Sequence, residues 1–295
     1  MQLKRRTVLV AGLYGAAAAC RPTLVPHTEP QKGGGPRMQR LQDKVDSQDR
    51  QAALFIPSSY DGSAAVPLLL GTHGRGGNAG IVYRKYGWQD ICEREGWLGV
   101  FPNYDPTNQT DSADNSYFDH LMKRVTGEHN VDAGRIWGSG FSGGCHRQYM
   151  LAVKHQWVRA IGVSGGAISH GDNPDRENPL TNHSRPISVL HIHGASDTSI
   201  PLGGGVLDGH DGARRGLLSV RDGIKPWIEN IHGVPVDGAS LPDGFPPRRG
   251  LRTHRWEGDN GHVVQIVVDP KLTHEWAFGY ATTAIASWFK RLKIG

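Results

Sequence analysis

Short apolar runs alternate along the chain with segments whose apolar residues recur every three or four positions. We expect strands at 68–72, 98–101, 135–138, 160–163, 187–191 and 262–268. We expect helices at 82–95, 117–128, 143–155, 220–232 and 281–292. This alternation is typical of βαβ units and a mainly parallel sheet. The pattern therefore predicts one doubly wound α/β domain over residues 50–295.

The first 20 residues have the composition of an export signal. A basic start at Lys4, Arg5 and Arg6 precedes an apolar run over 7–19, whose small final residues suit cleavage by signal peptidase. The Arg5-Arg6 pair also resembles a twin-arginine signal, although Val8 stands where such signals usually have Phe. We expect an exported protein and leave open whether it takes the general secretory or the twin-arginine route.

The end of the signal bears on membrane anchorage. Residues 17–20, Ala-Ala-Ala-Cys, resemble a bacterial lipobox, in which Cys20 would be lipidated after cleavage and would tether the protein to a membrane. Ala17 stands where a lipobox normally has Leu, so ordinary cleavage near Ala19 is the alternative. Residues 21–49 are rich in Pro, Gly, Gln and charge and have no hydrophobic period. They predict a flexible linker.

Composition narrows the class of partner. The formal net charge is +5, and removal of the signal with its three cations leaves about +2. There is no basic stripe with interleaved aromatic residues, which argues against nucleic-acid binding. No His, Cys and carboxylate residues stand at a metal-ligand spacing, so we expect neither a metal nor another cofactor. Nothing in the sequence fixes the oligomeric state.

The three cysteines leave one question open. If Cys20 carries a lipid, Cys92 and Cys145 remain as an even pair in an oxidising compartment. They form either a disulfide or two separate buried thiols, because sequence does not give the distance between them.

The strongest chemical motif is Gly-Phe-Ser-Gly-Gly at 140–144. It lies directly after the expected strand 135–138 and before the expected helix 143–155, which is the context of a nucleophile elbow. In such a turn the serine has a strained backbone, and small residues two positions before and after it prevent clashes. A glycine-rich turn that contains serine by chance is the alternative. We expect Ser142 to be the nucleophile.

A second glycine-rich segment, His-Gly-Arg-Gly-Gly at 73–77, follows the expected strand 68–72. An oxyanion hole needs a backbone N–H from such a loop in addition to the N–H after the nucleophile, here that of Gly143. Arg75 is the expected second donor and Gly76 the alternative. A phosphate-binding turn is disfavoured, because the loop lacks the Walker Lys-Ser/Thr and the Rossmann glycine spacing.

A serine nucleophile needs a histidine base and an acid that orients it. Asp197 lies in the loop 195–201, just after an expected strand, where the acid should be found. Asp208, Asp211 and Asp222 are less well placed, and a loop aspartate that only caps a turn is the alternative.

Two histidines compete for the role of base. Segments 251–257 and 262–268 resemble paired strands joined by a tight Asn-Gly turn, so His262 would begin the last strand. Active sites of open α/β sheets lie beyond the carboxyl ends of the strands, which is the opposite end. His274 follows the last strand and is the expected base, with His262 as the alternative. His191 and His193 flank the acid loop, either as pocket lining or as core histidines.

With these residues in place, the chain resembles the secreted polyhydroxybutyrate depolymerase and feruloyl/acetylxylan esterase group of α/β-hydrolases from about Arg50 onward. The resemblance rests on Pro-Leu-Leu-Leu at 67–70 before His73, Val-Asp at 131–132 before Arg-Ile at 135–136, the Ser142 motif, His-Ile-His-Gly at 191–194 before Asp197, and His-Glu-Trp at 274–276. Thr273 and Ala277 depart from the usual residues of the group.

This resemblance implies an esterase that acts on polyester oligomers or on acylated polysaccharide, through a Ser-His-Asp triad without a metal. It implies the roles of Ser142, Asp197 and His274, and we expect Trp276 and His73 in these motifs to contact the ester substrate. A serine peptidase of the same fold and a catalytically inactive surface binding protein are the alternatives, because fold does not fix function.

Overall fold

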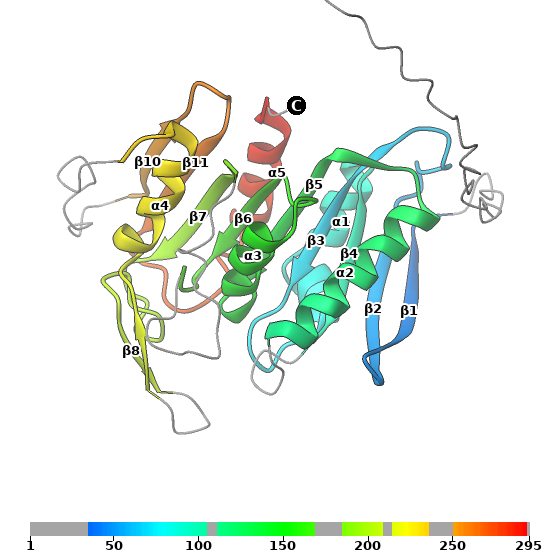
Figure 1. Ribbon diagram of the computed structural model, residues 1–295, viewed down its shortest axis with the longest axis horizontal. Helices are drawn as coiled ribbons and strands as arrows, with labels where there is room; N and C mark the ends of the chain where they lie inside the picture. Colours follow the sequence, from blue (N-terminus) through cyan, green and yellow to red (C-terminus); the bar gives the residue numbers. More distant parts are fainter. Residues whose placement is uncertain (1–34, 105–110, 169–184, 209–213, 236–249, 294–295) are drawn as a thin grey trace, which may run out of the picture.

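The computed structural model describes residues 35–104, 111–168, 185–208, 214–235 and 250–293 (Figure 1). Its strands are β1 (Arg37–Val45), β2 (Gln48–Ile56), β3 (Val66–Thr72), β4 (Leu98–Asn103), β5 (Val131–Phe141), β6 (Ala160–Ser164), β7 (Ser188–Gly194), β8 (Gly205–Asp208), β9 (Arg214–Leu217), β10 (Arg252–Glu257) and β11 (Val263–Asp269). Its helices are the π-helix η1 (Ile81–Lys85) and the α-helices α1 (Trp88–Glu95), α2 (Asp111–Glu128), α3 (Gly143–Lys154), α4 (Val220–His232) and α5 (Ala281–Arg291).

One nine-stranded sheet has the order β1-β2-β4-β3-β5-β6-β7-β11-β10. The strands from β4 to β11 in this order run parallel, while β1, β2 and β10 are antiparallel additions at the edges. Its central strands are almost wholly buried, as expected of parallel strands covered on both faces. The prediction of a mainly parallel, doubly wound α/β domain is confirmed.

Helices cover both faces of this sheet (Figure 1). Side chains of α2, α3 and α4 share one hydrophobic core with one face, and those of η1, α1 and α5 share a second core with the other. Gly162 in β6 permits close contact with α5, because a Cβ at this position would lie 2.2 Å from Cγ2 of Ile285. Because helices cover both faces, the end of the sheet at which the parallel strands terminate remains open for the loops that follow these strands.

The predicted flexible linker over 21–49 is wrong from Arg37 onward. Residues 37–45 form β1, which pairs with β2 and buries Leu41 and Val45. Most other side chains of β1 are polar or charged and exposed because β1 is an edge strand, where charge discourages pairing with other chains. Composition therefore indicated disorder where an edge strand lies. The predicted signal, Cys20 and residues 21–34 lie outside the described residues, so export and lipidation stay predictions.

Cys92 and Cys145 are free and fully buried. Cys92 belongs to the core under α1, whereas Cys145 in α3 belongs to the core on the other face. The alternative of two separate thiols is therefore the one observed. Burial raises the pKa of both thiols, which keeps them protonated and unreactive.

Over the described ranges, no helix has the length and apolar character needed to cross a membrane.

The position of β1 generates a stability prediction. Leu41 is only 1% exposed, so Leu41→Ala should lower the free energy of unfolding by about 2–5 kcal/mol through lost burial and a residual cavity. Met38→Ala on the same strand, at a side chain 40% exposed, should change it by less than about 0.5 kcal/mol. Urea denaturation of both variants measures the difference. A flexible linker would leave Leu41→Ala without effect.

Candidate active site

Ser142 lies in the sharp turn between β5 and α3. Its backbone has φ 55° and ψ −120°, a conformation that non-glycine residues rarely adopt. The Ser142 N–H donates to the carbonyl of Ser164 at the end of β6 (3.1 Å), and its carbonyl accepts from the N–H groups of Cys145 (3.0 Å) and His146 (3.2 Å). Bonds from the sheet on one side and the helix on the other hold the strained residue in place.

The flanking glycines allow this turn to pack. A Cβ on Gly140 would lie 2.3 Å from the carbonyl oxygen of Gly144, and a Cβ on Gly144 would lie 2.4 Å from the carbonyl oxygen of Thr72. Both contacts are with backbone, so no side chain can move aside to make room. The small residues that the sequence places two positions on either side of Ser142 are thus required by the geometry.

His274 joins Ser142 to Asp197. Its Nε2 lies 2.9 Å from Oγ of Ser142, and its Nδ1 lies 2.8 Å from Oδ2 of Asp197. The other carboxylate oxygen, Oδ1, accepts from the N–H groups of Ser199 (2.9 Å) and Ile200 (2.8 Å). The structure therefore brings together the three side chains expected to act as nucleophile, base and acid.

The charge of Asp197 determines which nitrogen of His274 carries the proton in the hydrogen-bonded path to Ser142. Burial raises the pKa of Asp197, but the hydrogen bonds from His274 and from the Ile200 N–H, together with nearby imidazoles, outweigh it and lower the pKa overall. An ionised carboxylate only accepts hydrogen bonds, so Nδ1 of His274 carries the proton. Its Nε2 is then free to accept the hydroxyl proton of Ser142, which is the arrangement a general base needs.

His262 lies at the other end of the sheet, as the hairpin argument predicted. Its Nδ1 is 3.3 Å from Oγ of Ser188, the first residue of β7, and its N–H donates to the Asn260 side chain. Of the alternative acids, Asp222 lies in the first turn of α4, where its N–H donates to Oγ of Ser219. Asp208 ends β8, and Asp211 lies outside the described residues.

The glycine-rich loop after β3 lies against the nucleophile. A Cβ on Gly74 would be 3.2 Å from Cβ of Ser142, so this loop approaches the serine as the sequence predicted. Tyr104 fixes the loop through its hydroxyl, which donates to the carbonyl of His73 (2.7 Å). Neither the N–H of Arg75 nor that of Gly143 has a protein acceptor among the described residues, so both are available as hydrogen-bond donors.

His73 and Trp276 do not have the positions expected of substrate contacts, since each is only 2% exposed. The His73 ring packs against Tyr104 with 4.6 Å between centroids, and its Nδ1–H donates to the carbonyl of Gly74. Trp276 stacks on Tyr86 at 4.7 Å and points away from solvent. Both rings therefore pack inward, although they belong to the loops that contain Gly74 and His274. Proximity in sequence to a catalytic motif does not reveal side-chain direction.

Two aromatic side chains near His274, those of Phe141 and Phe278, are more exposed than His73 and Trp276, and sequence reasoning missed them. The Phe141 ring is half-buried and lies 5.1 Å from the His274 ring. Tyr86 links it to Phe278, with centroid separations of 6.1 and 6.2 Å, and Phe278 is 48% exposed. The sequence offered only one signal, an aromatic residue, Phe278, two positions after Trp276.

A buried polar chain adjoins the acid loop. The hydroxyl of Tyr149 lies 2.9 Å from Nδ1 of His191, and Nε2 of His191 lies 3.0 Å from Nδ1 of His193. Nε2 of His193 lies 2.9 Å from the carbonyl of Ile200. Burial lowers the pKa of both histidines, so both are neutral near pH 7. Alternate positions on a buried strand point to the same face, which is how sequence could have paired them.

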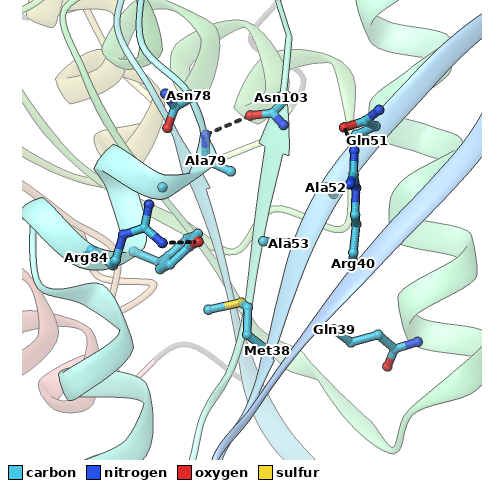
Figure 2. Close-up of a pocket in the computed structure, with 12 residues that line it drawn as sticks. Met38, Gln39, Arg40, Gln51, Ala52, Ala53, Asn78, Ala79, Arg84 and Asn103 are labelled. Carbon is cyan, nitrogen blue, oxygen red and sulfur yellow. Dashed lines mark hydrogen bonds between the residues drawn. The ribbon is translucent and has the colours of Figure 1, made fainter.

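A separate cavity of about 350 Å³ lies beside η1, the edge strand β1 and its neighbour β2 (Figure 2). Its lining includes Arg40, Gln51, Asn78, Tyr83, Arg84 and Asn103. The Ala79 N–H donates to Oδ1 of Asn103 (2.8 Å) at its upper wall in Figure 2. No nucleophile, carboxylate or imidazole lines it, so it does not contain the groups for acyl transfer. Within the described ranges, no cluster of His, Cys, Asp and Glu could hold a metal ion.

No protein-family model matches the chain. It is 29% identical over 209 residues to a probable feruloyl esterase C of Aspergillus flavus, which covers 67% of this chain and 74% of the relative. A feruloyl esterase C of Emericella nidulans is 32% identical over 166 residues, covering 53% of this chain and 58% of the relative. A bifunctional acetylxylan esterase/xylanase of Neocallimastix patriciarum is 23% identical, covering 50% of this chain and 21% of the relative.

Solved structures share the fold at low identity. The S-formylglutathione hydrolase FrmB of Staphylococcus aureus aligns with a TM-score of 0.58 and 12% identity, covering 88% of this chain and 98% of that structure. A ferulic acid esterase aligns with a TM-score of 0.54 and 11% identity, covering 86% and 96%. These structures show that the described domain has the α/β-hydrolase fold.

The neutral buried histidines predict how stability depends on pH. In the unfolded chain a histidine takes up a proton below about pH 6.5, whereas His191 and His193 in the folded state do so only at lower pH. The unfolded state then binds more protons. The free energy of unfolding should therefore fall between pH 7 and 5, by up to about 1.4 kcal/mol per pH unit for each histidine.

Denaturant unfolding at pH 7, 6 and 5 measures this slope. Burial also lowers the pKa of His129, His155, His254 and His262, which adds in the same direction. Asp197 adds in the same direction but at more acidic pH, because its folded pKa is also lowered and an aspartate of the unfolded chain takes up a proton only near about pH 4. Stability that is constant or rises from pH 7 to 5 would contradict the neutral pair.

Proposed function

We propose that this chain, which has the α/β-hydrolase fold and is similar in sequence to feruloyl and acetylxylan esterases, is a serine esterase that hydrolyses carboxylic esters through an acyl-enzyme on Ser142. The observation that carries the proposal is the continuous hydrogen-bonded path from Ser142 through His274 to Asp197. Its distances are short enough for proton transfer without rearrangement.

In the first half-reaction, Oγ of Ser142 attacks the ester carbonyl carbon while Nε2 of His274 takes the hydroxyl proton. The carbonyl oxygen becomes an oxyanion in the tetrahedral intermediate. The N–H groups of Gly143 and Arg75 would hold it, supported by the position of Gly143 at the start of α3 and by the close approach of Gly74 to Ser142. Collapse breaks the ester C–O bond, and the imidazolium gives its proton to the leaving alkoxide.

In the second half-reaction, water replaces the alcohol. Nε2 of His274 takes one water proton as the oxygen attacks the acyl carbon, and the second intermediate expels Ser142, which regains that proton. Asp197 stays ionised throughout and orients the imidazole, which is consistent with its lowered pKa. The products are a carboxylic acid and an alcohol, with no cofactor consumed.

The surroundings of His274 favour an aromatic acyl group. Phe141 lies beside His274, and the buried ring of Tyr86 joins Phe141 to Phe278, whose side chain is 48% exposed. Aromatic rings bind flat conjugated groups through stacked or edge contacts. A hydroxycinnamoyl ester such as feruloyl, named in the curated relatives, fits these rings better than a short acetyl or 3-hydroxybutyryl ester does.

Substitution of Ser142 and His274 tests the triad. Ser142→Ala and His274→Ala should each lower kcat for a 4-nitrophenyl ester by about 10³-fold or more, and the double variant should lose little more, because the residues act as one unit. Ser142→Ala should also lose labelling by a fluorophosphonate, which reports the nucleophile whatever the substrate is.

His262→Ala is the matched control and should keep kcat within about tenfold of the parent, or roughly 1.4 kcal/mol of barrier. A folded Ser142→Ala protein with parental ester hydrolysis would refute the esterase mechanism. Cleavage of peptides with no ester turnover would instead favour the serine peptidase, and a parent that neither hydrolyses esters nor takes the label would favour the inactive binding protein.

Phe278→Ala tests the acyl group. It should raise KM for methyl ferulate by about 2- to 10-fold, the value of one aromatic contact, and leave KM for 4-nitrophenyl acetate unchanged. Leu251→Ala, at an equally exposed apolar side chain just before β10, is the control and should affect neither ester. Faster hydrolysis of acetyl or 3-hydroxybutyrate oligomer esters, with no effect of Phe278→Ala, would overturn the aromatic acyl proposal while leaving the esterase in place.

A further inference from the structure

Two histidines face the same oxygen of the acid. Nδ1 of His274 lies 2.8 Å from Oδ2 of Asp197, and Nε2 of His193 lies 3.9 Å from that same atom. A carboxylate that pairs with His193 would orient His274 less well. The structure must therefore give the His193 ring a hydrogen-bond partner other than the Asp197 carboxylate.

The hydrogen bonds of His193 have a defined direction. The carbonyl of Ile200 can only accept, so Nε2 of His193 carries the proton and donates it there. In a neutral imidazole Nδ1 is then an acceptor, and its donor is Nε2–H of His191. Nδ1 of His191 accepts in turn from the hydroxyl of Tyr149. The carbonyl acceptor of Ile200 at the end of these hydrogen bonds thus fixes the tautomer of both histidines, and the Tyr149 hydroxyl supplies the donor that His191 then requires.

The hydrogen-bonded series formed by Tyr149, His191 and His193 is shielded from water. His191 and His193, both in β7, and Tyr149 in α3 are each fully buried. The two imidazoles stack with 5.2 Å between centroids, and the Tyr149 ring packs edge-on against Trp227 at 5.0 Å. Burial disfavours the imidazolium form, which supports the neutral tautomers derived from the hydrogen bonds.

The far end of the chain holds the acid loop. Ile200 accepts from His193 through its carbonyl, and its N–H donates to Oδ1 of Asp197. His193 therefore anchors the residue that itself orients the carboxylate.

We propose that Tyr149, His191 and His193 are positioning residues that fasten the acid loop and commit the proton of His193 to Ile200, so that Oδ2 of Asp197 serves His274 alone. The inference rests on the proposed esterase function. None of the three touches the reacting atoms. Without the hydrogen bonds from Tyr149 and His191, His193 could gain a second proton or turn towards Asp197, and His274 would lose its orientation. Because substrate does not reach these buried groups, the loss should lower kcat and leave KM unchanged.

Variants of His191 and Tyr149 test the proposal. His191→Leu removes both hydrogen bonds of the ring and should lower kcat by about 10- to 100-fold at constant KM, the scale expected for a misplaced catalytic group. His191→Gln offers an amide N–H to His193 and an amide oxygen to Tyr149, so it should restore kcat to within about threefold. Tyr149→Phe removes only the first donor and should give an intermediate loss.

Tyr117→Phe is the matched control. Tyr117 is also buried, and its hydroxyl donates to the carbonyl of Gln51, far from the acid loop in the fold. The same loss of one buried hydroxyl there should leave kcat unchanged. Equal losses of kcat in Tyr149→Phe and Tyr117→Phe, or a fully active His191→Leu, would overturn the proposal. If His191→Leu fails to fold, the pair of tyrosine variants decides.

A spectroscopic measurement separates this inference from the esterase itself. In ¹⁵N-labelled Ser142→Ala protein, imidazole ¹⁵N spectra should show His193 protonated at Nε2 and unprotonated at Nδ1. His191→Leu in the same background should change that pattern. If His193 is doubly protonated at neutral pH, or protonated at Nδ1, the proposed hydrogen-bond directions of Tyr149, His191 and His193 are refuted, even if ester hydrolysis depends on Ser142. Loss of the esterase function alone would instead leave the tautomer pattern intact.

Discussion

The strained backbone of Ser142 is the constraint around which the rest of the site is arranged. At φ 55° and ψ −120° the residue is unfavourable by itself, so it persists only where neighbouring structure fixes it. The carbonyl of Ser164 and the first N–H groups of α3 do so, and Gly140 and Gly144 allow the backbone to approach closely enough. The turn places Oγ beyond the sheet and the positive end of α3 behind it, where negative charge develops during acyl transfer.

Parallel strands bring the partners of Ser142 to it. β5, β7 and β11 all end at one edge of the sheet, so the loops that follow them meet although His274 is 132 residues from Ser142 and 77 from Asp197. The antiparallel β10 explains why His262 cannot join them. It returns the polypeptide to the opposite end of the sheet, so β11 starts beside the first residue of β7 and ends beside Gly194, just before the loop that carries Asp197.

Sequence predicted what depends on chain order and local pattern, and it failed where the answer depends on side-chain direction. Ser142, Asp197 and His274 follow from a turn motif and from the ends of expected strands, because the fold constrains the backbone there. His73 and Trp276 belong to the same motifs, yet their rings pack inward. Residues 37–49 were assigned to a linker because an edge strand needs few apolar residues, and only its pairing with β2 reveals it. The role of His191 and His193 depends on a tyrosine in α3, which no local pattern connects to them.

A core that contains two histidines and a tyrosine hydroxyl needs a physical reason, since buried polar groups destabilise a protein when they lack partners. Here every polar atom of Tyr149, His191 and His193 has one, from the hydroxyl at one end to the Ile200 carbonyl at the other. A fully paired network adds little net stability over an apolar core, but it specifies one arrangement, because any alternative leaves a buried group unsatisfied. Asp197 has two imidazoles within 4 Å, those of His274 and His193. Because the network permits only one arrangement of hydrogen bonds, the carboxylate pairs with His274, the base, and not with His193.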